Sequence, residues 1–92
     1  MKVVYTDSAL QDLDAILNYL ALHFPDAYQA FETRLLAIER RIGQWPRSAR
    51  RVAERPGVRI VSLVRYPYNV FYRIRSDAVE IPHIRHGARR DP

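Results

Sequence analysis

Arginine side chains carry the clearest chemical signal in this sequence. Fourteen of the 15 basic residues are arginines, and 13 of these follow residue 39. Residues 1–39 therefore have a net charge of −4, whereas residues 40–92 have a net charge of +9. A guanidinium group is a planar fork that pairs with phosphate or carboxylate through two hydrogen bonds. The C-terminal half thus predicts an anionic partner, either a nucleic acid or an acidic protein segment, and the alternative is a solvated basic surface.

Histidine supplies the only side chain with a pKa near neutrality, and His86 is the candidate for acid–base chemistry. The alternative is a strand-end histidine bonded to the backbone. The other histidines, His23 and His83, are scattered along the chain, and no carboxylate accompanies them at ligand spacing. With no cysteine in the chain, we expect neither a disulfide nor a cysteine-based zinc site. We expect no other metal site and no cofactor.

The length and composition predict one folded domain, residues 1–92, with a single modest core. Hydrophobic residues make up 48% of the chain and charged residues 27%, as in ordinary globular proteins. The apolar runs are too short to span a bilayer, and the first residues lack the apolar stretch of a secretion signal. We therefore expect a cytoplasmic protein.

The hydrophobic periodicity predicts two helices after an initial strand at residues 2–6. Apolar residues recur at helical spacing over residues 10–24 and 27–42, and Pro25 separates the two runs. Asp7 and Ser8 are candidate N-caps of the first helix. The buried stripe of that helix is expected to comprise Leu10, Leu13, Ile16, Leu17, Leu20 and Phe24. So short a connection predicts an antiparallel helical hairpin.

The second half predicts a loop and three strands. Residues 44–57 show no clean period and predict a basic connecting loop, with Trp45 packed onto the helices. Residues 58–65, 70–75 and 78–85 predict strands joined by tight turns. The order β-α-α-β-β-β indicates an α+β fold in which the hairpin packs on a mainly antiparallel four-stranded sheet. The open face of this sheet is expected to hold Arg59, Arg73, Arg75 and Arg85.

These features, in this order, resemble the RelE/ParE toxin superfamily, and in particular its ParE-like members. The motifs are Ala9 with Asp12-Leu13, Ile16 and Tyr19-Leu20, then Phe24-Pro25, Phe31, Leu35-Leu36, Trp45-Pro46, Gly57-Val58-Arg59, Tyr66-Pro67-Tyr68 before Val70–Ile74, and Ile84–Arg89. Two departures stand out. Residues 47–50 lack the glycine that often follows Pro46, and Pro82 lies inside the last strand, which must bulge there or use its outer edge.

The resemblance implies the toxin of a type II toxin–antitoxin system and leaves its target open. ParE-like toxins poison DNA gyrase, which blocks replication and requires no covalent chemistry. RelE-like toxins cleave messenger RNA on the ribosome without a metal, and the matching set here would be Arg59, Arg73 and His86. Because this catalytic set is thin, we expect a gyrase inhibitor rather than an enzyme. A third hypothesis is a non-toxic adaptor.

The resemblance also implies binding surfaces and a partner. The residues expected to bind the target are Arg59, Arg73, Arg75, Arg85, His86 and Arg89. A ParD-like antitoxin with an acidic segment is expected to form a hetero-oligomer with the chain by folding onto it. Its expected contacts are Leu13, Leu17, Leu20 and Arg73, although these leucines could equally belong to the core.

Overall fold

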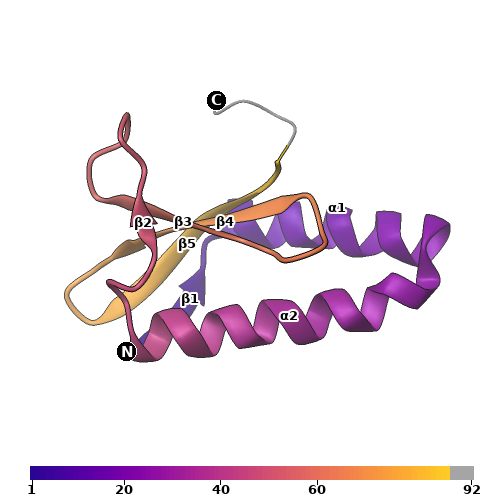
Figure 1. The fold of residues 1–92 in the computed structure, drawn as a ribbon, viewed down its shortest axis with the longest axis horizontal. Coiled ribbons are helices and arrows are strands. Elements are labelled where there is room, and N and C mark those ends of the chain that lie inside the picture. The colour runs from indigo at the N-terminus through magenta and orange to yellow at the C-terminus, as the bar shows by residue number, and fades with distance from the viewer. Residues whose placement is uncertain (88–92) are drawn as a thin grey trace.

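A computed structural model describes residues 1–87, and its elements follow one another as shown in Figure 1. They are β1 (Lys2–Tyr5), α1 (Asp7–His23), α2 (Pro25–Gln44), β2 (Arg50–Arg51), β3 (Val58–Ser62), β4 (Tyr68–Ile74) and β5 (Ala78–His86). The strands form one sheet in the order β1-β5-β4-β3-β2, in which β1 lies parallel to β5 and all other neighbours are antiparallel. The predicted α+β fold, with a helical hairpin on a mainly antiparallel sheet, is confirmed.

The sheet of the described residues has five strands, whereas the sequence predicted four. The additional strand is β2, where Arg50 pairs with Ile60 and Arg51 pairs with Arg59. This strand is two residues long, and both of its side chains are exposed. A pair of exposed arginines at a sheet edge shows neither apolar alternation nor a β-branched run, so its pattern is that of a loop.

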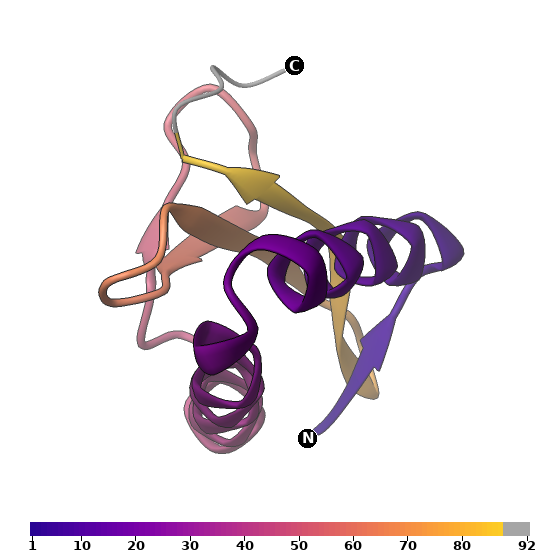
Figure 2. The ribbon, with the colours of Figure 1, turned by 90° about the vertical axis from the view of Figure 1, so that its right-hand side faces the viewer.

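Both helices pack on one face of the sheet and enclose the main hydrophobic core (Figure 2). The largest fully buried side chains are those of Tyr72, Phe31, Ile42, Ile81, Val70 and Val79. Phe31 meets the rings of Tyr66 and Tyr68 edge-on, with centroids 5.9 and 5.6 Å away. The aromatic contacts join the start of α2 to the turn between β3 and β4.

The N-cap of α1 is Thr6, one residue before the predicted caps Asp7 and Ser8. The Thr6 hydroxyl accepts a hydrogen bond from the Ala9 backbone N–H at 3.0 Å. Thr6 also continues the pairing of β1 with β5 by one residue, because its own N–H donates to the Ile81 carbonyl. Asp7 instead occupies the first turn of the helix, where its negative charge interacts favourably with the positive end of the helix dipole.

The predicted apolar stripe of α1 is only partly buried. Ala9, Ile16 and Leu20 are its buried residues, and they lie along one narrow line of the helix surface. Leu10 falls beside this line and is 49% exposed, while Phe24 lies at the junction with α2 and is 54% exposed. Both residues were wrongly predicted to be core.

A bulge in β5 confirms the expectation raised by Pro82. Phe71 pairs with His83, whereas Arg73 pairs with Glu80, so the register shifts by one residue between these pairs. Pro82 lies within this shift, where its missing N–H interrupts no regular pairing. Its carbonyl accepts a hydrogen bond from the Thr6 hydroxyl at 3.1 Å.

Neither helix of the described residues combines the length and the apolar composition that crossing a membrane would require.

Candidate functional site

The face of the sheet opposite the helices carries a cationic cluster at the start of β5. Arg73 pairs across the sheet with Val58 and with Glu80, which places these side chains on the open face. The Arg73 Nε lies 3.7 Å from the Glu80 Oε1, and the Arg75 guanidinium donates to the same oxygen at 3.1 Å. One carboxylate shared by two guanidinium groups leaves the cluster with a net positive charge.

A second basic group lies further along the same face. Arg85 and His83 pair with Asn69 and Phe71, and the Arg85 guanidinium lies 3.3 Å from the His83 Nδ1. Asn69 and Arg73 are four residues apart on β4, so the two basic groups lie about 13 Å apart. Within the described residues, the Nε atoms of Arg73 and Arg85 are buried without a hydrogen-bond partner.

Apolar side chains lie on the same face, beside the two basic groups. Val58 and Phe71 are buried there in a small cluster with Val52, and Ile60 packs against it. We call Arg73, Arg75, His83 and Arg85 the open-face surface. Its positive charge is spread over two groups beside this buried apolar cluster, which suits binding of an anionic partner better than it suits a reaction.

Arg59 lies on the other face and does not belong to the open-face surface, contrary to the expectation. It pairs with Tyr72, whose ring is buried beneath the helices. Its guanidinium donates to the Ala49 carbonyl at 2.7 Å and to the Arg47 carbonyl at 3.3 Å. Neither Glu80 nor Asp77 forms an ion pair with it. Arg59 therefore holds the loop before β2.

His86 also lies on the helix side of the sheet. It pairs with Tyr68, and the two rings meet edge-on with centroids 5.4 Å apart. The residues considered for RNA cleavage are thus separated, because Arg73 faces the open side while Arg59 and His86 face the helix side. Arg89, the remaining residue expected to bind the target, lies outside the described residues.

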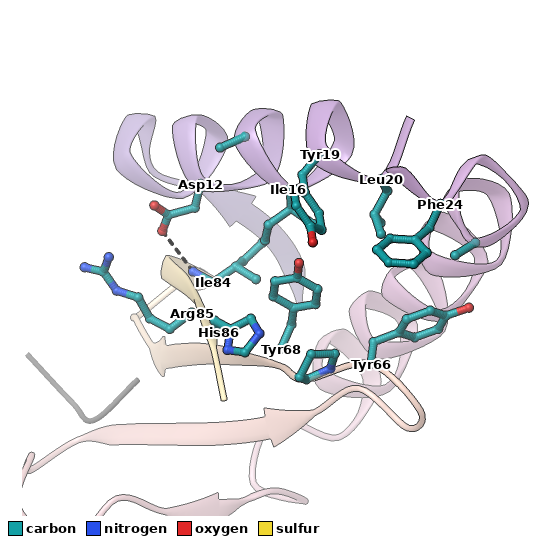
Figure 3. Close-up of a pocket in the computed structure, with 13 residues that line it drawn as sticks. Asp12, Ile16, Tyr19, Leu20, Phe24, Tyr66, Tyr68, Ile84, Arg85 and His86 are labelled. Carbon is teal, nitrogen blue, oxygen red and sulfur yellow. Dashed lines mark hydrogen bonds between the residues drawn. The ribbon is translucent and has the colours of Figure 1, made fainter. Parts of the chain in front are cut away.

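An aromatic groove of about 610 Å³ opens between α1 and the far end of the sheet (Figure 3). Ile16 and Leu20 from α1, Tyr68 from β4 and Ile84 from β5 are buried side chains that line it. Other lining residues include Tyr19, Phe24, Tyr66 and His86. Burial raises the pKa of Tyr68, so its phenol stays protonated at neutral pH and retains a hydrogen-bond donor in the groove.

The leucines expected to bind the antitoxin lie at different depths. Leu20 is buried and contributes to the groove, while Leu13 and Leu17 are half-buried against the core. Arg73 lies on the opposite side of the sheet, so the four predicted contacts do not share one surface. Sequence reasoning missed Tyr19, which is 49% exposed, because it lies off the apolar stripe.

Asp12 connects α1 to the half of β5 that carries Arg85 and His86. β1 pairs with β5 only as far as Ile81, so the following N–H groups of that edge have no strand beside them. The Asp12 carboxylate accepts the Ile84 N–H at 3.0 Å (Figure 3). It also lies 3.7 Å from the His83 Nδ1. Beyond the end of β1, a side chain of α1 thus accepts a hydrogen bond from the backbone of β5.

The described part of the chain brings together no group of three histidine, cysteine, aspartate or glutamate side chains that could hold a metal ion.

Comparison with known proteins gives a match over almost the whole chain. Residues 3–91 match a family described as the ParE toxin of the type II toxin–antitoxin system parDE. A solved structure titled "Chromosomal ParDE TA system from P. aeruginosa" is similar, with a TM-score of 0.78 and 25% sequence identity. The similarity covers 94% of this chain and 95% of that chain. No match was found among curated proteins.

Proposed function

Because the chain belongs to the ParE toxin family of type II toxin–antitoxin systems, we propose that it inhibits DNA gyrase, and hence replication, in the cytoplasm. The open-face surface is the part of the molecule that would contact the target. A ParD-like antitoxin would neutralise the chain by forming a hetero-oligomer with it.

The separation of Arg59, Arg73 and His86 is the observation that carries this proposal. Cleavage of RNA by a metal-free enzyme needs a base, an acid and a cation around one phosphate. Here one of the three residues lies on the open face and two lie on the helix side, and Arg59 is occupied by backbone carbonyls. Inhibition of a target by binding requires only a complementary surface, and Arg73, Arg75 and Arg85 share one.

The aromatic groove supports an antitoxin that binds as an amphipathic helix. Such helices insert apolar side chains into a groove at successive turns. Ile16 and Leu20 supply the apolar floor, Tyr19 and Phe24 are exposed beside it, and Arg85 lies at its rim for an acidic residue. The groove therefore takes the place of the predicted contacts at Leu13 and Leu17.

The proposal is tested with purified chain in gyrase supercoiling and DNA-cleavage assays. The wild-type chain is expected to inhibit supercoiling and to raise the yield of broken DNA. Arg73→Gln/Arg75→Gln should weaken inhibition at least tenfold. The matched control, Arg34→Gln/Arg65→Gln, removes the same charge from α2 and the β3–β4 turn and should retain inhibition. Unaltered supercoiling with folded wild-type chain would refute the proposal.

A parallel experiment separates gyrase inhibition from RNA cleavage. Expression of the chain without its antitoxin should produce DNA breaks and filamentous cells while transcript ends stay unchanged. New transcript ends at defined positions, together with intact gyrase activity, would instead assign the chain to the RNA-cleaving branch.

A further inference from the structure

The β2 edge of the sheet carries a concentration of arginines that the open-face surface does not use. Residues 40–59 have a net charge of +6, with Glu54 as their one acidic residue. Arg50 and Arg51 form the outermost strand, and both side chains are exposed. We call Arg47, Arg50, Arg51, Arg55 and Trp45 the arginine edge.

The guanidinium groups of the arginine edge have no anionic partner within the described residues. The salt bridges of residues 1–87 involve Arg73, Arg75 and His83, and none involves Arg47, Arg50, Arg51 or Arg55. Successive residues of a strand point to opposite sides, so Arg50 and Arg51 place charge on both sides of the edge. A polyanion running along the edge would meet cations on either side.

The backbone beneath these arginines is held by three long side chains. Arg41 donates to the Ser48 hydroxyl at 3.1 Å and to its carbonyl at 3.2 Å. Arg59 donates to the Ala49 carbonyl, and the buried Tyr72 hydroxyl donates to the Pro46 carbonyl at 2.6 Å. Since these bonds fix the loop before a ligand arrives, less ordering accompanies binding.

Trp45 distinguishes this edge from a merely solvated basic surface. It was expected to pack onto the helices, but its side chain is 62% exposed, and it stacks on no other ring of the described residues. A single exposed aromatic residue is ordinary on a monomer, but this one lies two residues before Arg47 and opens the segment that carries the other edge arginines. Flat aromatic side chains among cations are typical of surfaces that bind unpaired bases by stacking.

We propose that the arginine edge binds single-stranded nucleic acid, with its guanidinium groups on the phosphates and the Trp45 indole stacked on a base. An acidic protein segment would satisfy the charges equally well, but it would leave the indole unused. Duplex DNA would meet the arginines but offers no unstacked base to the ring. The inference does not depend on gyrase as the target of the toxin.

The test uses the full chain and a fluorescently labelled oligothymidylate of about 12 nucleotides, a length within the site sizes of single-strand binders. Binding is followed by anisotropy, and separately by quenching of Trp45, which is the sole tryptophan. Trp45→Ala should weaken binding roughly tenfold, while Trp45→Phe should retain most of it. Circular dichroism of each variant confirms that it is folded.

Salt titrations identify the phosphate contacts. The slope of log K against log salt is negative, and each lost phosphate contact makes it less steep by about 0.7. Arg50→Gln/Arg51→Gln should therefore reduce its magnitude by about 1.4. The control Arg34→Gln/Arg65→Gln removes the same charge elsewhere and should leave the slope unchanged. Equal losses in both double variants would mean unspecific attraction and overturn the proposal.

Three other results would also overturn it. These are unquenched Trp45 fluorescence at saturating oligonucleotide, duplex DNA bound as tightly as the single strand, and edge variants that lose antitoxin binding but keep the oligonucleotide. Because no gyrase is present in these assays, their failure would leave the proposed inhibition of gyrase standing.

Discussion

Replacement of Asp12 should release the end of β5 from α1. In Asp12→Ala the Ile84 N–H loses its carboxylate acceptor at an edge where β1 no longer pairs. A hydrogen bond to a charged group contributes about 1.5–3 kcal/mol, and because the Asp12 side chain is partly exposed we expect about 2 kcal/mol. At about 4–8 °C per kcal/mol for a chain of this size, the melting temperature should fall by roughly 10 °C.

The measurement that isolates this bond is hydrogen exchange at the Ile84 amide. A loss of about 2 kcal/mol corresponds to roughly thirtyfold faster exchange, whereas amides in the centre of β4 should respond only to the global change. Asp12→Asn keeps an acceptor oxygen and should lose about half as much. Asp14→Asn is the matched control, because its carboxylate is on the exposed side of the same helix. Unchanged exchange at Ile84 in Asp12→Ala would refute the reasoning.

Three further changes test the packing. Tyr5→Phe removes the 2.5 Å hydrogen bond to Glu39 and should cost about 1–2 kcal/mol in urea denaturation at pH 7. Burial, and then the hydrogen bond to Glu39, raise the pKa of Tyr5 in the folded chain. The wild type should therefore lose stability as the pH rises above about 10, where the unfolded chain ionises, and Tyr5→Phe should lose less. Parallel curves of stability against pH for the two proteins would contradict this. Arg59→Met leaves the Ala49 carbonyl without its hydrogen-bond donor and should lower the free energy of unfolding by about 1–2 kcal/mol in the same assay. An unchanged denaturation midpoint would show that the loop keeps its conformation without this bond. Gly57 has a φ of +80°, so Gly57→Ala should lower the free energy of unfolding by about 1–2 kcal/mol. Gly57→Asn should lower it less when both variants are measured by calorimetry. Equal losses in the two variants would point to a steric cause instead.

The element types of this fold were accessible from the sequence because each one has a local cause. Apolar periods and Pro25 indicate the two helices, and alternation marks β4. The bulge in β5 followed from the missing N–H of Pro82. In contrast, β2 could not be predicted, because two arginines become a strand only when β3 lies beside them.

The candidate site was harder to predict because its composition depends on register. Arg59 and Arg73 are similar in local pattern, yet pairing with Tyr72 places Arg59 on the helix side, whereas pairing with Val58 places Arg73 on the open face. Likewise, the aromatic groove depends on where the junction of α1 and α2 places Phe24. Such a position follows from the packing of α1 and α2, not from the residues around Phe24.

The extra residue at Pro82 acts on β5 as a one-position frame shift. If the pairing of Arg73 with Glu80 continued without interruption, Tyr68 would lie opposite Arg85 and not opposite His86. Arg85 would then lie on the helix side of the sheet and His86 on the open face. A relative that lacks this one residue would keep the same partners along a regular strand, so an alignment without a gap here would match residues that meet different partners.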